Sequence, residues 1–276
     1  MLFLTGTGWA VMMSLLVQRE VLPYFEFQAP PSYRTWLAKK DRAEATRYRI
    51  YQADHNVGQM ETLVLPLEDG SAHMESRLQF QMMGQEILMS TEVEIDQGQQ
   101  LKSFQMNGKF ASLPIWIQAT RFGRKLKVAY NLSFLKKGKE EIDFPRDTML
   151  TGGFMPVMDG GNLDVGKKRR VKSLPIWEML GGQKMGAFAS SDLYATVEAR
   201  REIRFQGKDL PAYEVVIRKG PTEDARISHR IFIGDDGTPL RTVFQTGKTE
   251  YEIRLDHVQQ MTPADAKNWE WNVKKK

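Results

Sequence analysis

The sequence predicts an all-β fold, mainly antiparallel, preceded by one N-terminal membrane-anchor helix. Three observations predict it. Apolar and polar residues alternate with period two in many segments after residue 45, glycine-containing turns separate these segments, and Met1–Val17 carries no charged side chain. Period-two alternation is typical of strands with one dry and one wet face. We therefore expect a curved sheet or open half-barrel with few short helices.

The uncharged N-terminal stretch has a length at the lower end of the range for a membrane-spanning helix. No basic region precedes it and no small-x-small cleavage motif follows it, so an uncleaved anchor over residues 1–22 is favoured over a cleaved signal peptide. Two alternatives stay open. The stretch is part of a signal peptide whose basic start lies upstream, or it is an apolar helix packed on the domain.

Residues 23–44 predict a linker beside the membrane, because Pro23, Pro30 and Pro31 prevent a continuous helix. Aromatic residues are frequent within the linker and include Tyr24, Phe25, Phe27, Tyr33 and Trp36. Such rings suit the headgroup zone of a bilayer. They also suit a second interpretation, in which they pack the linker against the domain.

Residues 45–260 are expected to form the antiparallel β domain. The clearest strand is 248–255, where Tyr251, Ile253 and Leu255 alternate with Glu252 and Arg254. Similar alternation predicts strands at 86–95, 213–218 and 226–233. Turn signals are expected at Asp69-Gly70, Asn107-Gly108, Lys137-Gly138, Gln206-Gly207, Asp236-Gly237 and Thr246-Gly247. Strands joined so closely must be antiparallel.

Two segments depart from the strand pattern. Residues 143–171 break the alternation and are expected to divide two runs of strands. Thr262-Pro263-Ala264-Asp265 has the cap residue, first-turn proline and acidic residue of a helix start, so 261–276 predicts a short helix with a basic tail. Ser-Leu-Pro-Ile-Trp occurs at 112–116 and again at 173–177, which is too short to establish a duplicated half.

The sequence offers no arrangement of residues that specifies a reaction. It contains no cysteine, which excludes disulfides, thiol catalysis and cysteine-ligated zinc. The four histidines lack metal-ligand spacing, and His229 lies on an apolar strand face where a core imidazole is expected. Nucleophile-elbow, zinc-protease and phosphate-loop motifs are missing. We therefore expect no enzyme activity, no metal and no cofactor.

Two groups of residues are candidates for ligand contact. Phe104, Met106, Trp116 and Met89 are expected to line an apolar cavity, because flexible thioethers and aromatic rings accept apolar ligands of variable shape. Core filling is the alternative for these side chains.

The second group is the basic run Lys167, Lys168, Arg169 and Arg170. Clustered cations bind anionic lipid headgroups, with a solvated loop as the alternative. No recognition helix or base-stacking motif accompanies the run, so we expect no nucleic-acid partner.

Short stretches carry a resemblance to a known group of proteins. They are residues 19–25, Ala29–Tyr33, Tyr48–Tyr51, Val57-Gly58, Tyr213–Ile217 and Gly237–Arg241. With these stretches the chain resembles uncharacterised bacterial envelope proteins, and the domain is similar to the half-barrel of periplasmic lipoprotein carriers. The resemblance implies an antiparallel sheet folded over an apolar cavity, outside the cytoplasmic membrane and without catalysis. No ligand residue of that group can be carried over, and no lipobox cysteine is present.

The expected function is a membrane-tethered, non-catalytic β domain of the bacterial envelope that binds an apolar or lipid-bearing ligand. The alternative is a structural or assembly protein that binds another envelope protein through its sheet. Basic residues between 19 and 40 follow the anchor and would favour a cytoplasmic domain by the positive-inside tendency. That tendency is weak here because the N-terminal flank is one residue long, so we expect the envelope side, with the cytoplasmic side left open.

Overall fold

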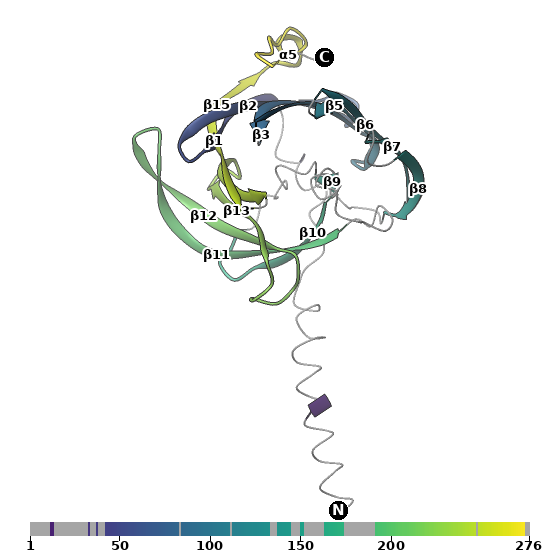
Figure 1. The fold of residues 1–276 in the computed structure, drawn as a ribbon. Coiled ribbons are helices and arrows are strands. Elements are labelled where there is room, and N and C mark those ends of the chain that lie inside the picture. The colour runs from purple at the N-terminus through teal and green to yellow at the C-terminus, as the bar shows by residue number, and fades with distance from the viewer. Residues whose placement is uncertain are drawn as a thin grey trace, which may run out of the picture.

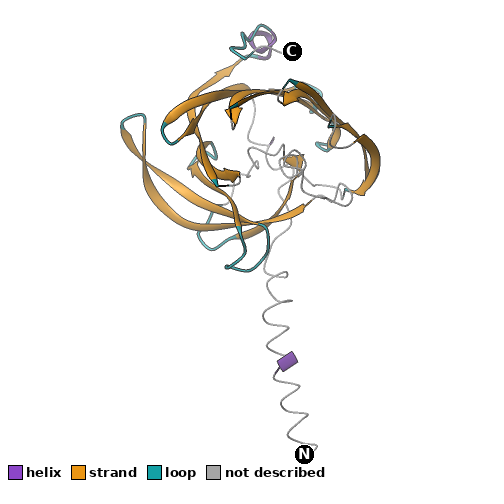
Figure 2. Ribbon diagram, in the orientation of Figure 1, coloured by secondary structure: helices purple, strands orange, loops and turns teal. Residues whose placement is uncertain are grey.

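The protein folds as one curled β-sheet. The computed structural model describes residues 12–13, 33, 37, 42–82, 84–110, 112–132, 137–144, 150–151, 163–173, 191–246 and 248–273. Fifteen strands and one short helix account for most of them (Figure 2). The expectation of an all-β fold with little helix is confirmed. None of the helices within these residues is long and apolar enough to cross a membrane. Nearly all of Met1–Val17 lies outside the described residues, so the anchor stays a prediction.

The strands follow one another along the chain and end in a helix. Their bounds are β1 Ala43–Gln52, β2 His55–Pro66, β3 Ala72–Met82, β4 Gln85–Ile95, β5 Leu101–Phe110, β6 Leu113–Phe122, β7 Lys125–Asn131, β8 Lys137–Asp143, β9 Leu150–Thr151, β10 Lys168–Ser173, β11 Ser191–Phe205, β12 Lys208–Arg218, β13 Ile227–Gly234, β14 Pro239–Thr246 and β15 Thr249–Met261, followed by α5 Pro263–Lys267.

The strand order shows how two runs of strands become one sheet. Each strand pairs with its sequence neighbour within β1–β8 and within β10–β15, and β1 pairs with β15, so the two runs join at the middle of the sheet. Strands β8 and β9 are its two edges, and β9 with β10 is the one parallel pair among the described strands. The sheet curls almost into a ring (Figure 1), but no described strand pairs β8 with β9. It is therefore open, as expected.

The helix α5 identifies the outer face of the sheet. It lies outside the ring in Figure 1 and packs on Ala43, Ala45 and Leu63. Successive residues of a strand point to opposite faces, so Tyr48 and Ile50 face the interior of the ring. We call this interior surface the concave face. The predicted helix start is confirmed: the Thr262 hydroxyl oxygen accepts a hydrogen bond from the backbone N–H of Asp265 at 3.2 Å.

The concave face carries the main hydrophobic core. Buried side chains from β1–β7, β14 and β15, together with Ala212 of β12, form one cluster that includes Phe80, Phe104 and Tyr251. A second cluster lies on β10–β13. The strand registers place Ile231 opposite Thr242 and Thr242 opposite Ile253, so this second cluster belongs to the same face. Tyr33 and Leu37, which precede the first strand, are also buried in the main cluster.

Two glycines lie in strands at positions where atoms of the neighbouring strand leave no room for a side chain. A Cβ atom at Gly58 would collide with Phe80, whose ring reaches Tyr251 with 6.0 Å between ring centroids. A Cβ at Gly108 would lie 2.8 Å from Met89 Cγ. The turn predicted at Asn107-Gly108 is wrong, because both residues lie inside β5. There the glycine serves close packing rather than chain reversal.

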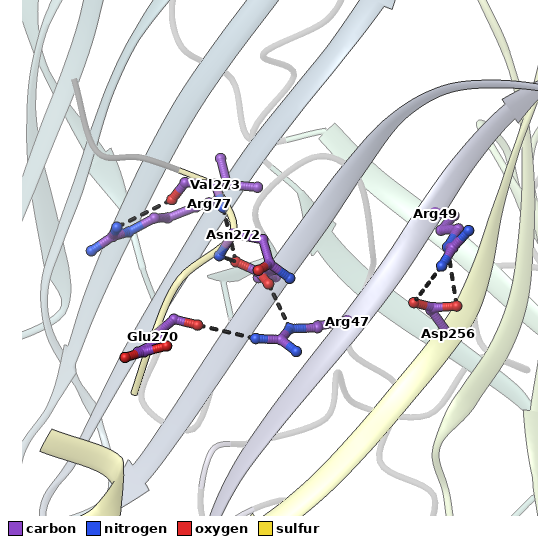
Figure 3. A network of polar contacts seen from close by, with 8 residues as sticks. Arg47, Arg49, Arg77, Asp256, Glu270, Asn272 and Val273 are labelled. Carbon is purple, nitrogen blue, oxygen red and sulfur yellow. Dashed lines mark hydrogen bonds and ion pairs between the residues drawn. The ribbon is translucent and has the colours of Figure 1, made fainter. Parts of the chain in front are cut away.

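Residues 270–273 are held on the outer face by hydrogen bonds around Glu61 (Figure 3). The buried Glu61 carboxylate accepts hydrogen bonds from the backbone N–H groups of Asn272 at 2.8 Å and Val273 at 3.1 Å. Arg47 Nε donates to the same carboxylate at 2.7 Å and a second nitrogen of Arg47 donates to the Glu270 carbonyl at 3.0 Å. Arg77 donates to the Val273 carbonyl. We call this set of contacts the C-terminal clasp.

Two cation–π contacts complete the clasp. The Arg47 guanidinium lies 4.4 Å from the ring centroid of Trp269, and that of Arg77 lies 4.2 Å from the ring centroid of Trp271. Both indoles pack against the small outer cluster of Ala43, Ala45 and Leu63. Residues 269–273 are therefore bound to strands β1, β2 and β3.

Replacing Glu61 by Ala is expected to destabilise the domain strongly, because Arg47 and two backbone N–H groups would lose their partner in a buried site. Loss of one partner of a buried charged pair costs about 3–5 kcal/mol, measured as the free energy of unfolding in urea. Asp256→Ala is the matched control, since the Arg49–Asp256 pair in Figure 3 is largely exposed and exposed pairs contribute below about 1 kcal/mol. Equal costs for the two variants would contradict the clasp.

The hydrogen bonds in the turn between β2 and β3 should make the Asp69 carboxyl group unusually acidic. Hydrogen bonds from the Ser71 hydroxyl, the Gln97 amide and the Ser71 backbone N–H lower the pKa of Asp69 to about 2. A lowered pKa means that the contribution of Asp69 to stability is present above its ordinary pKa and is lost as the pH falls through about 2. A carbon-detected NMR titration should show this midpoint, and Ser71→Ala should raise it. A wild-type midpoint near the ordinary value of about 3.9 would disprove the bonding.

Candidate functional site: the concave apolar face

Three of the four predicted apolar site residues come together on the concave face. Strand register places Phe104 opposite Val93, Met106 opposite Thr91 and Met89 opposite Gly108, all across the β4–β5 pair. Phe104, Met106 and Met89 are buried members of the main cluster. The alternation at 86–95 predicts β4 and orients Met89 correctly, whereas β5, which carries Phe104 and Met106, is not among the predicted strands.

Trp116 does not join them. It lies between the buried residues Ile115 and Ile117 of β6, and neighbouring residues of a strand point to opposite faces. Its indole is half-buried on the outer face, in register with Asn107 of β5 and Asn131 of β7. Grouping Trp116 with Phe104 on one face is corrected by this geometry, because residue type alone does not fix the side to which a side chain points.

The concave face as a whole is apolar and rich in flexible or flat side chains. Its buried methionines are Met60, Met82, Met89 and Met106, and its buried aromatic residues include Tyr48, Phe80, Phe104, Tyr130, Phe244 and Tyr251. Thioethers adapt to ligands of variable shape, and aromatic rings supply large contact areas. A surface of this composition can bury acyl chains or other apolar groups, and it offers no charged group for a polar substrate within its described cluster.

Tyr33 and Leu37 show how the concave face is covered in this structure. Both have helical backbone, and they are four residues apart, which puts their side chains on the same side of a helix. Both are buried in the main cluster. For Tyr33, the interpretation that linker aromatics pack on the domain is the one the structure supports. Sequence reasoning missed Leu37, although its spacing from Tyr33 was a usable signal.

The polar groups on the concave face have structural surroundings. Burial raises the pKa of the Tyr48 phenol well above its usual range, with Glu44 and Asp236 adding to the effect, so the phenol stays protonated. The His229 ring stacks on Phe244, with 6.0 Å between ring centroids, and its Nδ1 lies 2.9 Å from the Ser228 hydroxyl. This placement agrees with an imidazole used for packing. No group of three acidic or histidine side chains suited to a metal ion occurs among the described residues.

Three of the four residues of the basic run lie in a strand. Lys167 precedes it and forms an ion pair with Asp164 at 2.8 Å, and Lys168–Ser173 is strand β10, antiparallel to β11. Lys168, Arg169 and Arg170 are half-buried, and Val171 beside them is fully buried in the second cluster. The loop interpretation is therefore wrong for Lys168, Arg169 and Arg170. Contact with anionic lipid stays a prediction for these residues.

Comparisons with known proteins place the fold. No protein-family model and no curated protein matches the chain. The crystal structure of a β-barrel-like protein of the domain of unknown function DUF1849 from Brucella abortus is similar, with a TM-score of 0.51 at 12% identity over 80% of this chain and 98% of that one. A DUF1089 family protein from Pseudomonas aeruginosa gives a TM-score of 0.35 at 11% identity over 69% and 90% of the two chains.

A third structure is a domain from Vibrio parahaemolyticus provisionally described as an outer membrane lipoprotein-sorting protein. It gives a TM-score of 0.22 at 10% identity over 84% of this chain and 92% of that one. The last two scores are too low to support a conclusion, and the first supports the fold alone. The expected likeness to an uncharacterised bacterial β domain is confirmed at the level of the fold.

Because Phe104 lies on the concave face and Trp116 on the outer face, replacing each by alanine should lower the free energy of unfolding by different amounts. Phe104→Ala should lower the free energy of unfolding by about 3–5 kcal/mol, because it leaves a cavity in a packed core. Trp116→Ala should cost clearly less, since its ring is half-buried on the outer face. Urea unfolding of both variants measures the difference. A larger cost for Trp116→Ala would contradict the assigned faces.

Proposed function

We propose that this chain is a non-catalytic, membrane-tethered domain of the bacterial envelope that binds an apolar or lipid-bearing ligand on its concave face. The observation that carries the proposal is the open curled sheet whose interior surface is continuous, apolar and rich in methionine and aromatic residues. Ligand pockets are lined mainly by such side chains.

Tethering and place rest on the sequence. The uncharged Met1–Val17 would anchor the domain, and the resemblance to envelope β domains favours the outer side of the cytoplasmic membrane. The basic strand β10 would then contact anionic headgroups through Lys168, Arg169 and Arg170. A ligand extracted from lipid would have a short path to the concave face.

The second candidate function is assembly with another envelope protein through the sheet edge. Among the described strands, β8 pairs only with β7, so its other edge is a candidate for pairing with an added strand. Its sequence, Lys-Gly-Lys-Glu-Glu-Ile-Asp, is highly charged. Charged residues on an edge strand are a common protection against such pairing, so ligand binding is the better-supported function.

The test is ligand capture by the full-length chain. Native mass spectrometry and lipid extraction should recover a bound lipid, and a fluorescent fatty acid should bind in a saturable way. The double variant Tyr33→Ala, Leu37→Ala should raise fatty-acid uptake several-fold, because it uncovers part of the concave face. Trp116→Ala, on the outer face, is the matched control and should leave uptake unchanged. A ligand-free species with no uptake by either the parent or the double variant would overturn the proposal.

A further inference from the structure

A groove at the end of β11 combines arginines of the outer face with apolar side chains that belong to or pack against the main cluster, so its chemistry differs from that of the concave face. It has a volume of about 400 Å³ and lies between the end of β11, its turn, and the neighbouring parts of β1, β14 and β15. The side-chain amide of Gln206, in the β11–β12 turn, donates to the Asp256 carbonyl at 2.8 Å. This hydrogen bond fastens the hairpin of β11 and β12 against β15 and fixes one wall of the groove.

The floor of the groove consists of two arginines that share one carboxylate. Arg254 donates to Glu252 at 2.7 and 2.9 Å, and Arg241 donates to the same carboxylate at 3.2 Å. Glu252 and Arg254 alternate along β15 with the buried residues Tyr251 and Ile253, so they point away from the concave face. One carboxylate cannot satisfy all ten N–H donors of two guanidinium groups.

The charge of the groove is positive. Its charged lining residues are three arginines, Arg204, Arg241 and Arg254, against two carboxylates, Glu252 and Asp256. Asp256 is already engaged by Arg49 at 3.1 Å, and Arg254 also donates to Asp54 at 2.8 Å. Arg204 is exposed, and its nearest acidic partner, Asp209, is 3.8 Å away. An anion entering the groove would therefore meet donors from three strands.

Apolar and aromatic side chains line the rest of the groove. Ile203 and Phe205 of β11 form one wall, Leu240 and Leu255 lie across from them, and the Tyr51 ring lies under the Arg254 guanidinium at 4.4 Å from its centroid. The ring and the carboxylate hold Arg254 in a fixed orientation. Such a site suits a ligand that combines an anionic group with an apolar or aromatic portion.

We propose that this groove binds a phosphate group attached to an apolar moiety. Phosphate is favoured over carboxylate because the donors approach from three strands and a phosphate offers three acceptor oxygens in three directions. The planar fork of a guanidinium group also matches phosphate oxygens well. The apolar moiety lies against Ile203 and Phe205. Either a membrane lipid headgroup or a soluble phosphate ester carries this chemistry. Arg241 and Arg254 point away from the concave face, so anion binding in the groove does not depend on the proposed lipid surface, while the apolar lining of the groove borders the main cluster.

Calorimetric titration of the full-length chain tests the site with phenyl phosphate and with inorganic phosphate. Phenyl phosphate should bind at one saturable site, more tightly than inorganic phosphate. Arg241→Lys, which keeps the charge but removes the fork, should weaken phenyl phosphate binding about tenfold. Arg204→Gln should weaken it too, and its exposed position makes misfolding of the variant no concern. Phe205→Ala should weaken binding of phenyl phosphate but not of inorganic phosphate.

The matched control is Arg200→Gln, which removes an arginine of β11 that pairs with Asp235 outside the groove. It should leave both affinities unchanged.

Flotation with phosphatidylglycerol and phosphatidylcholine vesicles separates the two sources of the phosphate group. A preference for phosphatidylglycerol that is lost in Arg241→Lys assigns a lipid headgroup, and no such preference assigns a soluble ester. The proposal is overturned if Arg200→Gln weakens binding as much as Arg204→Gln, or if no probe binds in a saturable way. Fatty-acid uptake should be unaffected by Arg241→Lys, so this test and that of the concave face fail independently.

Discussion

The pairing of β1 with β15 is the contact on which the rest of the structure depends. It runs antiparallel from Ala43 opposite Met261 to Tyr51 opposite Glu252 and joins the two runs of strands into one sheet. Without it, β1–β8 and β10–β15 would be two separate sheets, each with an apolar face half-covered. With it, buried residues of both runs share one interior, as the contact between Phe80 and Tyr251 shows. The concave face is therefore a product of a long-range pairing.

The same junction organises the outer face. Arg47, near the middle of β1, takes part in the C-terminal clasp, and Tyr51, near the end of β1, lines the arginine-rich groove. One strand thus contributes to the concave core, to the clasp and to the groove by alternating its side chains. The arginines of the groove and the core side chains of the concave face point to opposite faces of the same strands, which lets an anionic and an apolar portion be recognised separately.

The sequence predicts the strands well because a half-buried strand shows its pattern locally. The alternation around Tyr251 and Ile253 is sufficient to orient β15, and Thr262-Pro263 is sufficient to begin α5. The pattern fails where a residue's role is decided by a distant partner. Residue type groups Trp116 with Phe104, Asn107-Gly108 has the composition of a turn, and the basic run is compatible with both lipid contact and a solvated loop.

The candidate sites were predicted only in part for the same reason. Phe104, Met106 and Met89 were found because core residues and ligand-accepting residues look alike in a sequence. The groove was missed, since Arg204, Arg241 and Arg254 are far apart along the chain and each looks like an ordinary solvent-facing strand residue. Glu61 was missed because its partners, Asn272 and Val273, contribute backbone groups that carry no sequence signal.

The clasp has a consequence for biosynthesis. Its residues 269–273 leave the ribosome after all the strands of the sheet, yet they cover Ala43, Ala45 and Leu63 of the first two strands. Until β15 and these residues have been synthesised, β1 lacks one of its partner strands and this small apolar area is exposed, a state in which nascent chains associate with chaperones or aggregate. A chain that ended before Trp269 would retain that exposure permanently.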